Sequence, residues 1–416
     1  MSRNPANLSP SPTHAGSLLP LLSVVSALLW IPALVAAEEV KEKVQVDVFN
    51  GPVLSSQRAV GLGGAIIGLA EGVASQLDNP AAFAYRSGQM GEEEFDWDVG
   101  FAGFDLVGSD VDIDMSGSPG GYEKAAAFQL GGNLKWGTLG CGLHISHLGY
   151  RLPISSAGDQ NTVYYAWSQQ SYGLGLASLF DDGQWVAGVM LGFSHATMAN
   201  KDTGTSVQMA SDFEIGSIGI LWAPTARPYR VGLSIKRSVQ MTQAGASSFV
   251  GNLVNDLGDL LVPRAVHVPW TVGVGGAYML LGRRSLNRSP RLGRSLPIDH
   301  AQELVQSGRY LLATADVVMT GPTEDGIGIQ GWLTQIKQVS GTSKSFAVRS
   351  GLEAELIEGW LLVRGGGYFE PNRFEGRIGR LHWTAGFDVK VPLMHDWSLS
   401  LAADGARDYF NLVVGV

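Results

Sequence analysis

Apolar and polar residues alternate one by one along many short segments of this sequence, and no other feature restricts the fold as much. The apolar face of residues 379–391 consists of Leu381, Trp383, Ala385, Phe387, Val389 and Val391. The opposite face consists of Arg380, His382, Thr384, Asp388 and Lys390. A period of two residues with one fully apolar face is typical of a β-strand whose two faces meet different environments. The same alternation in residues 345–357 and 228–240 favours an all-β protein.

Fourteen segments of this kind follow one another along the chain. They are 96–107, 124–136, 138–150, 163–179, 184–198, 205–222, 228–240, 265–281, 309–320, 345–357, 360–370, 379–391, 396–404 and 407–416. Strands of soluble β-sandwiches alternate in the same way as strands of membrane β-barrels. The lengths of the turns must therefore distinguish these two classes of protein. Single-chain bacterial barrels have an even number of strands, short turns at the periplasmic end and longer loops at the outer end. The sequence therefore predicts a transmembrane antiparallel β-barrel of about fourteen strands over residues 96–416.

The connections between the segments show this alternation of short turns and long loops. The short turns are 137–138, 181–184, 223–228, 358–359 and 392–396, and the long loops are 108–123, 151–162, 241–264 and 321–344. Five tryptophans lie beside short turns: Trp136, Trp185, Trp222, Trp360 and Trp397. Tryptophan is enriched where the bilayer meets water. One connection departs from the pattern, because residues 282–308 form a long and basic insertion at the predicted periplasmic end.

The first 37 residues have the features of a secretory signal peptide. An apolar run from Leu18 to Val35 is followed by small residues and then by the acidic Glu38. A membrane anchor is the alternative, but two prolines interrupt the run. No later stretch offers the ~20 consecutive apolar residues that a membrane helix needs. A single cysteine, Cys141, excludes a disulfide framework, and the net charge of −9 argues against nucleic acid as a partner.

Residues 58–87 are rich in small side chains and end in an Asn-Pro turn. The small residues include Gly61, Gly63, Gly64, Ala65 and Gly68, and the turn consists of Asp78, Asn79, Pro80 and Ala81. Each glycine inside a helix costs roughly 0.5–1 kcal/mol relative to alanine, so this stretch does not make a stable helix by itself. We expect it to need a surrounding structure, and the predicted barrel can supply one.

A Gly-rich run that ends in Asp-Asn-Pro-Ala soon after the signal peptide resembles the N-terminal hatch of the FadL family of outer-membrane transporters for hydrophobic compounds. Residues 262–275 and 362–373 also resemble segments of that family. The resemblance implies a hatch inside the barrel lumen, formed from residues 38–95 and including Gly61, Gly63, Gly64, Asn79, Pro80 and Ala81. The basic insertion and the short loop at 199–204 depart from the family pattern.

The resemblance also implies a function. The chain would be a monomeric channel of the bacterial outer membrane that takes up long-chain fatty acids or other hydrophobic small molecules, with the lipid bilayer as its other partner. Barrels of the PorV type share the hatch without being such transporters. The alternative is therefore a non-transporting barrel that acts as a scaffold or as a partner in protein secretion.

The outer loop 241–264 is the candidate ligand-binding stretch. Its apolar residues recur at helical spacing: Phe249, Val250, Leu253, Val254, Leu257, Leu260 and Leu261. An amphipathic helix in such a loop either packs over the barrel mouth as a lid or offers its apolar face to a ligand. Both hypotheses stay open on the sequence alone. Trp332, Leu333 and Ile336 in the next outer loop could complete the apolar patch.

The sequence offers no catalytic or metal-binding constellation, so we predict no enzyme activity, no cofactor and no metal site. His144 and His147 are three residues apart on a predicted strand, where they point to opposite faces. The run Gly326-x-Gly328-x-x-Gly331 matches a dinucleotide-binding pattern but lacks the β-α-β context. The basic insertion 282–308 is either a solvated loop or an arm that docks on an acidic partner or on lipid headgroups.

Overall fold

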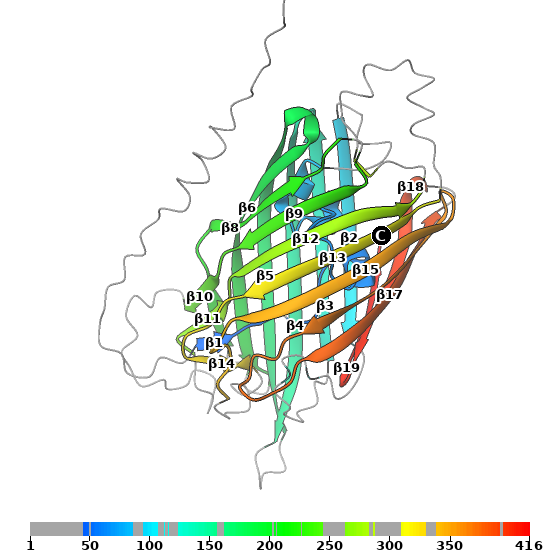
Figure 1. Ribbon diagram of the computed structural model, residues 1–416. Helices are drawn as coiled ribbons and strands as arrows, with labels where there is room; N and C mark the ends of the chain where they lie inside the picture. Colours follow the sequence, from blue (N-terminus) through cyan, green and yellow to red (C-terminus); the bar gives the residue numbers. More distant parts are fainter. Residues whose placement is uncertain are drawn as a thin grey trace, which may run out of the picture. The chain divides into compact units, whose positions relative to one another are not determined.

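The computed structural model of this protein contains a ring of strands in which each strand pairs antiparallel with the next one along the chain. The ring consists of β2 (Phe95–Leu106), β3 (Lys124–Trp136), β4 (Leu139–Ser155), β5 (Thr162–Phe180), β6 (Trp185–Asn200), β8 (Glu214–Trp222), β9 (Tyr229–Lys236), β12 (Thr271–Leu281), β13 (Leu311–Thr320), β15 (Ser345–Ile357), β16 (Leu361–Glu370), β17 (Arg380–Val391), β18 (Met394–Ala406) and β19 (Tyr409–Gly415). β19 pairs in turn with β2, which closes the ring (Figure 1). The predicted fourteen-stranded barrel is confirmed.

The structure describes most of the chain from residue 45 onward. The described residues are 45–49, 51–85, 95–106, 112, 115, 124–155, 162–201, 204, 206–225, 227–243, 263–282, 286–287, 309–329, 338–391 and 394–416. The predicted signal peptide, the apolar residues Phe249–Leu261 and the patch of Trp332, Leu333 and Ile336 lie outside these ranges. Within them, no helix is long and apolar enough to span a membrane.

The apolar faces of the strands point outward. On β17, Leu381 and Trp383 are 73% and 55% exposed, whereas Arg380 and His382 are 8% and 2% exposed. The other strands repeat this arrangement, with exposed leucine, valine and phenylalanine on the outside. A water-soluble sheet would bury that apolar face, whereas a membrane barrel turns it toward lipid. The alternation in the sequence therefore marks the lipid face and the lumen face of the wall.

Three consecutive predicted strands are broken in two. The outer parts are β7 (Ser206–Ala210), β10 (Val239–Gln243) and β11 (Ala265–Val268). Residues 211–213, 237–238 and 269–270 separate these parts from β8, β9 and β12, so the prediction of continuous strands is wrong here. Pro269 has no N–H to contribute to a ladder. The neighbouring strand β6 also shifts its register between Met190 and Leu191. Both features interrupt the wall at the same level.

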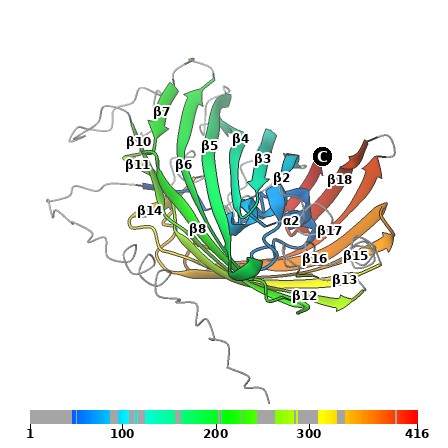
Figure 2. The same ribbon diagram turned by 90° about the horizontal axis from the view of Figure 1, so that it is seen from above.

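Residues 51–85, the inner segment, lie within the ring of strands (Figure 2). They form three short turns of helix: α2 (Gln57–Gly61), α3 (Gly72–Ser75) and the 3₁₀ helix η1 (Pro80–Phe83). Ser56 caps α2 by accepting from the N–H of Ala59 at 3.1 Å. Each helix is too short to be stable alone. The barrel wall must therefore supply the contacts that hold the segment in place.

A short strand that the sequence pattern does not predict precedes the inner segment. β1 (Gln45–Asp47) runs parallel to both β11 and β14 (Gly326–Gly328), at the end of the barrel that carries the long loops. Asp47 is buried and accepts hydrogen bonds from Arg373 at 3.0 and 3.1 Å. Thr323 donates to the same carboxylate at 2.7 Å. These contacts fix the entry of the chain into the barrel.

Candidate functional site

Two glycines of the inner segment lie in direct backbone contact with the wall. A Cβ atom at Gly68 would lie 2.5 Å from Cα of Gly276. A Cβ atom at Gly63, where φ is +62°, would lie 2.7 Å from the backbone N of Gly367. Both distances are too short for a side chain, and the positive φ is one that glycine adopts at no steric cost. Two Gly-rich backbones thus approach each other where any larger residue would push the segment off the wall.

Phe83 anchors the other end of the inner segment in a recess made of small wall residues. A Cβ atom at Gly175 would lie 1.9 Å from the Phe83 ring, and one at Gly140 would lie 2.0 Å from its carbonyl oxygen. Ala177 and Leu179 pack in the same buried cluster. The Gly140-Cys141-Gly142 run therefore has a packing reason, with the glycines facing Phe83 and the Cys141 side chain exposed on the outside.

The predicted Asn-Pro turn makes the hydrogen bonds that shape this end. The Asn79 amide donates to the carbonyl of Ile67 at 2.9 Å and to that of Ile220, on β8, at 3.3 Å. Its side-chain oxygen accepts from the N–H of Ala81 at 3.1 Å, and Pro80 opens η1. One side chain thus joins two parts of the inner segment to the wall.

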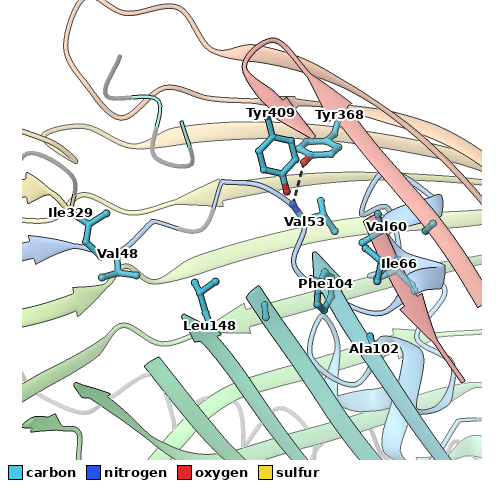
Figure 3. Close-up of a cluster of buried hydrophobic side chains, with 14 of the residues drawn as sticks. Val48, Val53, Val60, Ile66, Ala102, Phe104, Leu148, Ile329, Tyr368 and Tyr409 are labelled. Carbon is cyan, nitrogen blue, oxygen red and sulfur yellow. Dashed lines mark hydrogen bonds between the residues drawn. The ribbon is translucent and has the colours of Figure 1, made fainter. Parts of the chain in front are cut away.

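Apolar contacts fix the middle of the segment (Figure 3). Val60 and Ile66 are fully buried in one cluster with Ala102 and Phe104 of β2. The backbone N–H of Val53 donates to the hydroxyl of Tyr368 at 3.2 Å, which is the dashed line in Figure 3. Removing these side chains from water stabilises the arrangement by about 1.5–3 kcal/mol for each large one.

Ion pairs with the buried carboxylate of Glu353 hold α2 against the wall at β15 and β16. Glu353, with no exposed surface, accepts from the Arg58 guanidinium at 2.7 and 2.8 Å and from Arg364 at 2.6 Å. Tyr310 donates to the same carboxylate at 2.8 Å, and Arg364 is also paired with Asp388. The alternation along the strands places Glu353, Arg364 and Asp388 on the lumen face, but it cannot show that Glu353 pairs with Arg58 of the inner segment. The charges do not leave an open polar lumen, because they bind the inner segment.

Arg230 joins the inner segment to the basic insertion. Its guanidinium donates to the carbonyl of Leu69 at 2.9 Å, pairs with Glu71 and donates to Oδ1 of Asn287 at 2.7 Å. Asn287 is 2% exposed, and its amide donates to the carbonyls of Pro224, Arg227 and Tyr229 at 2.7–3.0 Å. The hypothesis of a solvated loop is therefore wrong for this part of the insertion, which docks on the short-turn end of the barrel.

We expect Asn287→Ala to lower the stability of the barrel at its short-turn end. The change leaves the carbonyls of Pro224, Arg227 and Tyr229 and the Arg230 guanidinium without that amide, at a cost of about 1–3 kcal/mol for each buried group left unsatisfied. The melting temperature of the folded barrel, followed by its heat-modifiable migration in gels, should fall. Gln208→Ala, which removes an exposed amide from β7, is the control and should leave it unchanged. Equal melting temperatures for the two variants would show that the Asn287 contact does not matter.

A cavity of about 330 Å³, the lumen cavity, lies between the inner segment and the wall. Ile67 and Leu77 line it from the inner segment, and Met190, Val268 and Val318 line it from the wall. Its polar lining includes Asp78, Lys236, Arg349, Gln169, Ser217 and Ser234. The side-chain oxygens of Gln169, Ser217 and Ser234 are buried and have no hydrogen-bond partner among the residues that the structure describes. An apolar chamber with a few convergent polar groups is what a small-molecule site requires.

The lumen cavity reaches the outside through a break in the wall, the wall gap. The ladder between β8 and β9 ends where the backbone N–H of Arg237 donates to the carbonyl of Gly216. Strand pairing resumes only between β7 and β10, where Ala210 lies opposite Thr242. The cavity lining includes residues on both sides of this break: Ser211, Glu214, Gly216, Arg237 and Val239. The interruption of the three strands thus creates an opening. Sequence reasoning missed it, although Pro269 was a signal.

Aromatic side chains flank the outer side of the wall gap. Tyr172 stacks on Phe193 with their ring centroids 5.0 Å apart, and Phe213 lies 6.5 Å from Phe193. Tyr172 and Phe193 also line the lumen cavity. Across the gap itself, Arg237 pairs with Glu214 at 2.5 Å, and the Arg237 side chain is well exposed. A hydrophobic molecule in the bilayer would meet an aromatic surface here before it met the cavity.

The remaining sequence-predicted residues fall into two groups. The ligand-loop residues from Phe249 to Leu261 lie outside the described residues, so their role stays a prediction. His144 is buried on the lumen side, whereas His147 stacks on the outward Phe128 at 5.4 Å, as the strand spacing predicted. Among the described residues no group of histidine, cysteine and acidic side chains could hold a metal ion.

Solved structures of outer-membrane channels have the same fold as this chain. A Pseudomonas aeruginosa FadL homologue matches with a TM-score of 0.50 and 12% identity, over 87% of this chain and 96% of that chain. The Pseudomonas putida toluene transporter TodX matches with a TM-score of 0.50 and 11% identity, over 90% and 99%. A TodX deltaS2S3 mutant monoaromatic hydrocarbon channel matches with a TM-score of 0.51 and 11% identity, over 86% and 97%.

These likenesses confirm the FadL-type fold that the residues predicted. No protein-family model and no curated protein matches the sequence. A closed barrel with an outward apolar band of this kind lies in a bacterial outer membrane, so the predicted location is also confirmed.

Proposed function

We propose that this protein is an outer-membrane channel for hydrophobic small molecules, with long-chain fatty acids and small aromatic hydrocarbons as its candidate cargo. The observation that carries the proposal is the continuity between the lumen cavity and the wall gap. The proteins of the same fold bear the names FadL homologue, toluene transporter and monoaromatic hydrocarbon channel, which supports a hydrophobic cargo.

The inner segment acts as a hatch in this proposal. Gly63, Gly68 and Phe83 lie against the wall, and Arg58 and Arg230 are held by buried carboxylates. A route straight through the centre would have to separate these ion pairs, and stranding a buried charge costs several kcal/mol. A route from the lumen cavity to the wall gap avoids them. The hatch then blocks water and ions while the cargo moves sideways into the bilayer.

The polar groups of the lumen cavity orient the cargo. Lys236 and Arg349 line the cavity together with Asp78, whose carboxylate lies 3.8 Å from the Lys236 Nζ. A carboxylate head group can approach the two cations while its alkyl chain lies against Ile67, Met190 and Val318. Each methylene removed from water contributes ~0.8 kcal/mol. The loop residues Phe249–Leu261 would supply the first capture surface.

Filling the lumen cavity tests the proposal. Ser234→Phe and Ser217→Phe each place a ring in the cavity from a buried inward position. Ser350→Phe adds the same ring at an exposed position on β15 and is the matched control. We expect uptake of radiolabelled oleate and toluene by cells that lack other carriers to fall by about an order of magnitude in the first two variants only. Unchanged uptake would contradict the proposed route.

A scaffold or secretion partner that transports nothing is the second candidate, favoured only by the many contacts that hold the inner segment. It predicts that the unaltered protein gives no uptake above that of empty cells. The same assay therefore decides between the two functions.

A further inference from the structure

The arrangement of apolar residues outside and polar residues inside is reversed in the outer parts of β4, β5, β6 and β7. On β5, Leu174 and Leu176 face lipid and are about half exposed. Nearer the long loops, the inward residues of the same strand include Trp167 and Tyr165, and both are buried. The neighbouring strands also bury apolar inward residues there: Leu148, Met198, Val207 and Met209. A sheet with one packed apolar face and one polar face is typical of a surface that meets water. These parts of the strands therefore lie outside the hydrocarbon layer.

An aromatic pair marks the border at which the reversal begins. Tyr172 of β5 lies opposite Phe193 of β6, and the two rings stack with their centroids 5.0 Å apart. The next outward positions beyond this pair are Gln170 and His195, which lie opposite each other. Aromatic side chains collect where the acyl chains meet the headgroups. The outward residues beyond Tyr172 and Phe193 therefore lie at the level of the headgroups and above.

These outward residues form a continuous surface, the outer polar face, on residues 147–151, 164–170, 195–201 and 206–210. Its members among the described residues are small or polar, and none is a leucine, isoleucine, valine or phenylalanine. The other side of the barrel differs, since Phe346 and Leu381 are exposed outward near the outer ends of β15 and β17. The polar extension beyond the border is thus a property of β4 to β7.

The outer polar face is taller than a layer of phospholipid headgroups. From Gln170 to Tyr164 it follows β5 for about 20 Å, at ~3.3 Å per residue. A strand tilt of about 40° converts this length into a height of about 15 Å. The headgroups of a phospholipid leaflet occupy only about 5–8 Å, half the difference between the full bilayer and its hydrocarbon core. A lipid that covers this face needs a headgroup several sugar rings tall.

Two exposed cations, Arg151 and Lys201, lie at the far edge of the outer polar face. Arg151 lies opposite Ala166 on β5, and the backbone N–H of Lys201 donates to the carbonyl of Tyr164 on the same strand at 2.8 Å. The two cations are therefore two strands apart, with a Cα separation of about 12 Å. Neither side chain forms an ion pair with another residue that the structure describes. Both are thus available to an anionic group.

The charges of the outer polar face favour a phosphorylated sugar. Its described residues include arginine, lysine and histidine but no carboxylate. Asp212 and Glu214 follow β7 at the wall gap, where Glu214 is paired with Arg237. Arginine and lysine form strong hydrogen bonds with phosphate, and serine, threonine and glutamine side chains can exchange hydrogen bonds with sugar hydroxyls. Phosphates and sugars occur together in the headgroup of lipopolysaccharide, the glycolipid of the outer leaflet of a bacterial outer membrane.

We propose that the outer polar face binds the phosphorylated sugar headgroup of lipopolysaccharide. Arg151 and Lys201 hold phosphate groups of the headgroup, while Ser168 and Thr197, which lie opposite each other, bind its sugars. The acyl chains of the same molecule lie against the apolar band on the other side of Tyr172. This site is on the outside of the wall, and binding there does not depend on transport or on the hatch.

Binding of lipopolysaccharide to the purified barrel tests the proposal. The probe is lipopolysaccharide truncated to its inner core sugars, and native mass spectrometry gives the fraction of the barrel that carries it. Binding should be saturable, and the double variant Arg151→Gln/Lys201→Gln should weaken it by about tenfold or more. The control is Arg377→Gln/Arg407→Gln, which removes two exposed cations from outer connections on the other side of the barrel. No saturable binding, or the same affinity in both double variants, would overturn the proposal.

Two further comparisons test the headgroup and its place on the wall. Phosphatidylglycerol, which has a phosphate but no sugar, should bind more weakly than lipopolysaccharide. Equally tight binding would overturn the assignment of a sugar headgroup. Thr197→Glu adds a carboxylate to the outer polar face and should weaken binding of lipopolysaccharide by about fivefold, whereas Thr197→Gln, of the same size, should not. An equal effect of the two changes, or none of either, would overturn the contact between an anionic headgroup and this face.

Discussion

Removing residues 51–88 should convert a nearly non-conducting barrel into an open pore. The ring of fourteen strands closes through its own ladders, and the deletion removes the contacts of the inner segment with the lumen face. A closed barrel satisfies its backbone hydrogen bonds without any plug. Single-channel conductance in planar bilayers should therefore rise by about an order of magnitude, since barrels of this size that lack a plug hold water.

The deletion also distinguishes a hatch from a structural core. Heat-modifiable migration in gels reports whether the shortened barrel folds, and it should be retained. Ala177 and Leu179 would lose Phe83, and the buried Glu353 would lose Arg58, so a lower melting temperature is expected. A folded barrel with the conductance of the intact protein would show that residues 51–88 do not close the lumen, and the hatch would have to be abandoned.

The strands of this protein could be predicted because the two faces of the wall meet different solvents. Trp383 and Phe387 face lipid and Arg380 faces the lumen, so apolar and polar residues alternate visibly in the sequence. The breaks at residues 211–213 and 237–238 carry no such signal. They depend on how neighbouring ladders shift, and only Pro269 in the third strand could have indicated one.

The candidate site was harder to predict because its residues are far apart in the chain. Arg58 and Glu353 are separated by 295 residues, and their pairing depends on the stagger of the strands. β1 has only three residues, too few for any periodicity. Asn287 lies in a polar and basic stretch where nothing marks it as buried. The small residues of the inner segment, in contrast, indicated a close backbone approach.

The buried charges in the lumen face need an explanation, because isolated buried charges are costly. Those that hold the inner segment are matched: Glu353 by Arg58 and Arg364, and Arg230 by Glu71. Such a network contributes little compared with apolar packing, but it is very sensitive to the loss of one partner. It therefore fixes one position of the inner segment in the lumen. Apolar contacts alone would allow the Gly-rich backbone to slide along the wall.

Glu353→Ala should release α2 from the wall without unfolding the barrel. The change leaves the partly exposed guanidinium of Arg58 and the buried one of Arg364 without their shared carboxylate, and breaking a buried ion pair costs about 3–5 kcal/mol. Hydrogen exchange of the peptides that cover residues 51–85 should accelerate strongly, and brief channel openings should appear. Glu358→Ala, in the exposed turn of the same hairpin, is the matched control and should change neither.

A double-mutant cycle then shows whether the effect comes from the ion pair. If Arg58 acts through Glu353, the variant that carries both Arg58→Ala and Glu353→Ala should be less perturbed than the sum of the two single changes, with a coupling of about 0.5–3 kcal/mol. Arg364 keeps its second carboxylate, Asp388, in every variant, so it does not account for the coupling. Additive effects, or unchanged exchange of residues 51–85 in Glu353→Ala, would show that packing of Val60, Ile66 and Phe83 is sufficient to hold the segment.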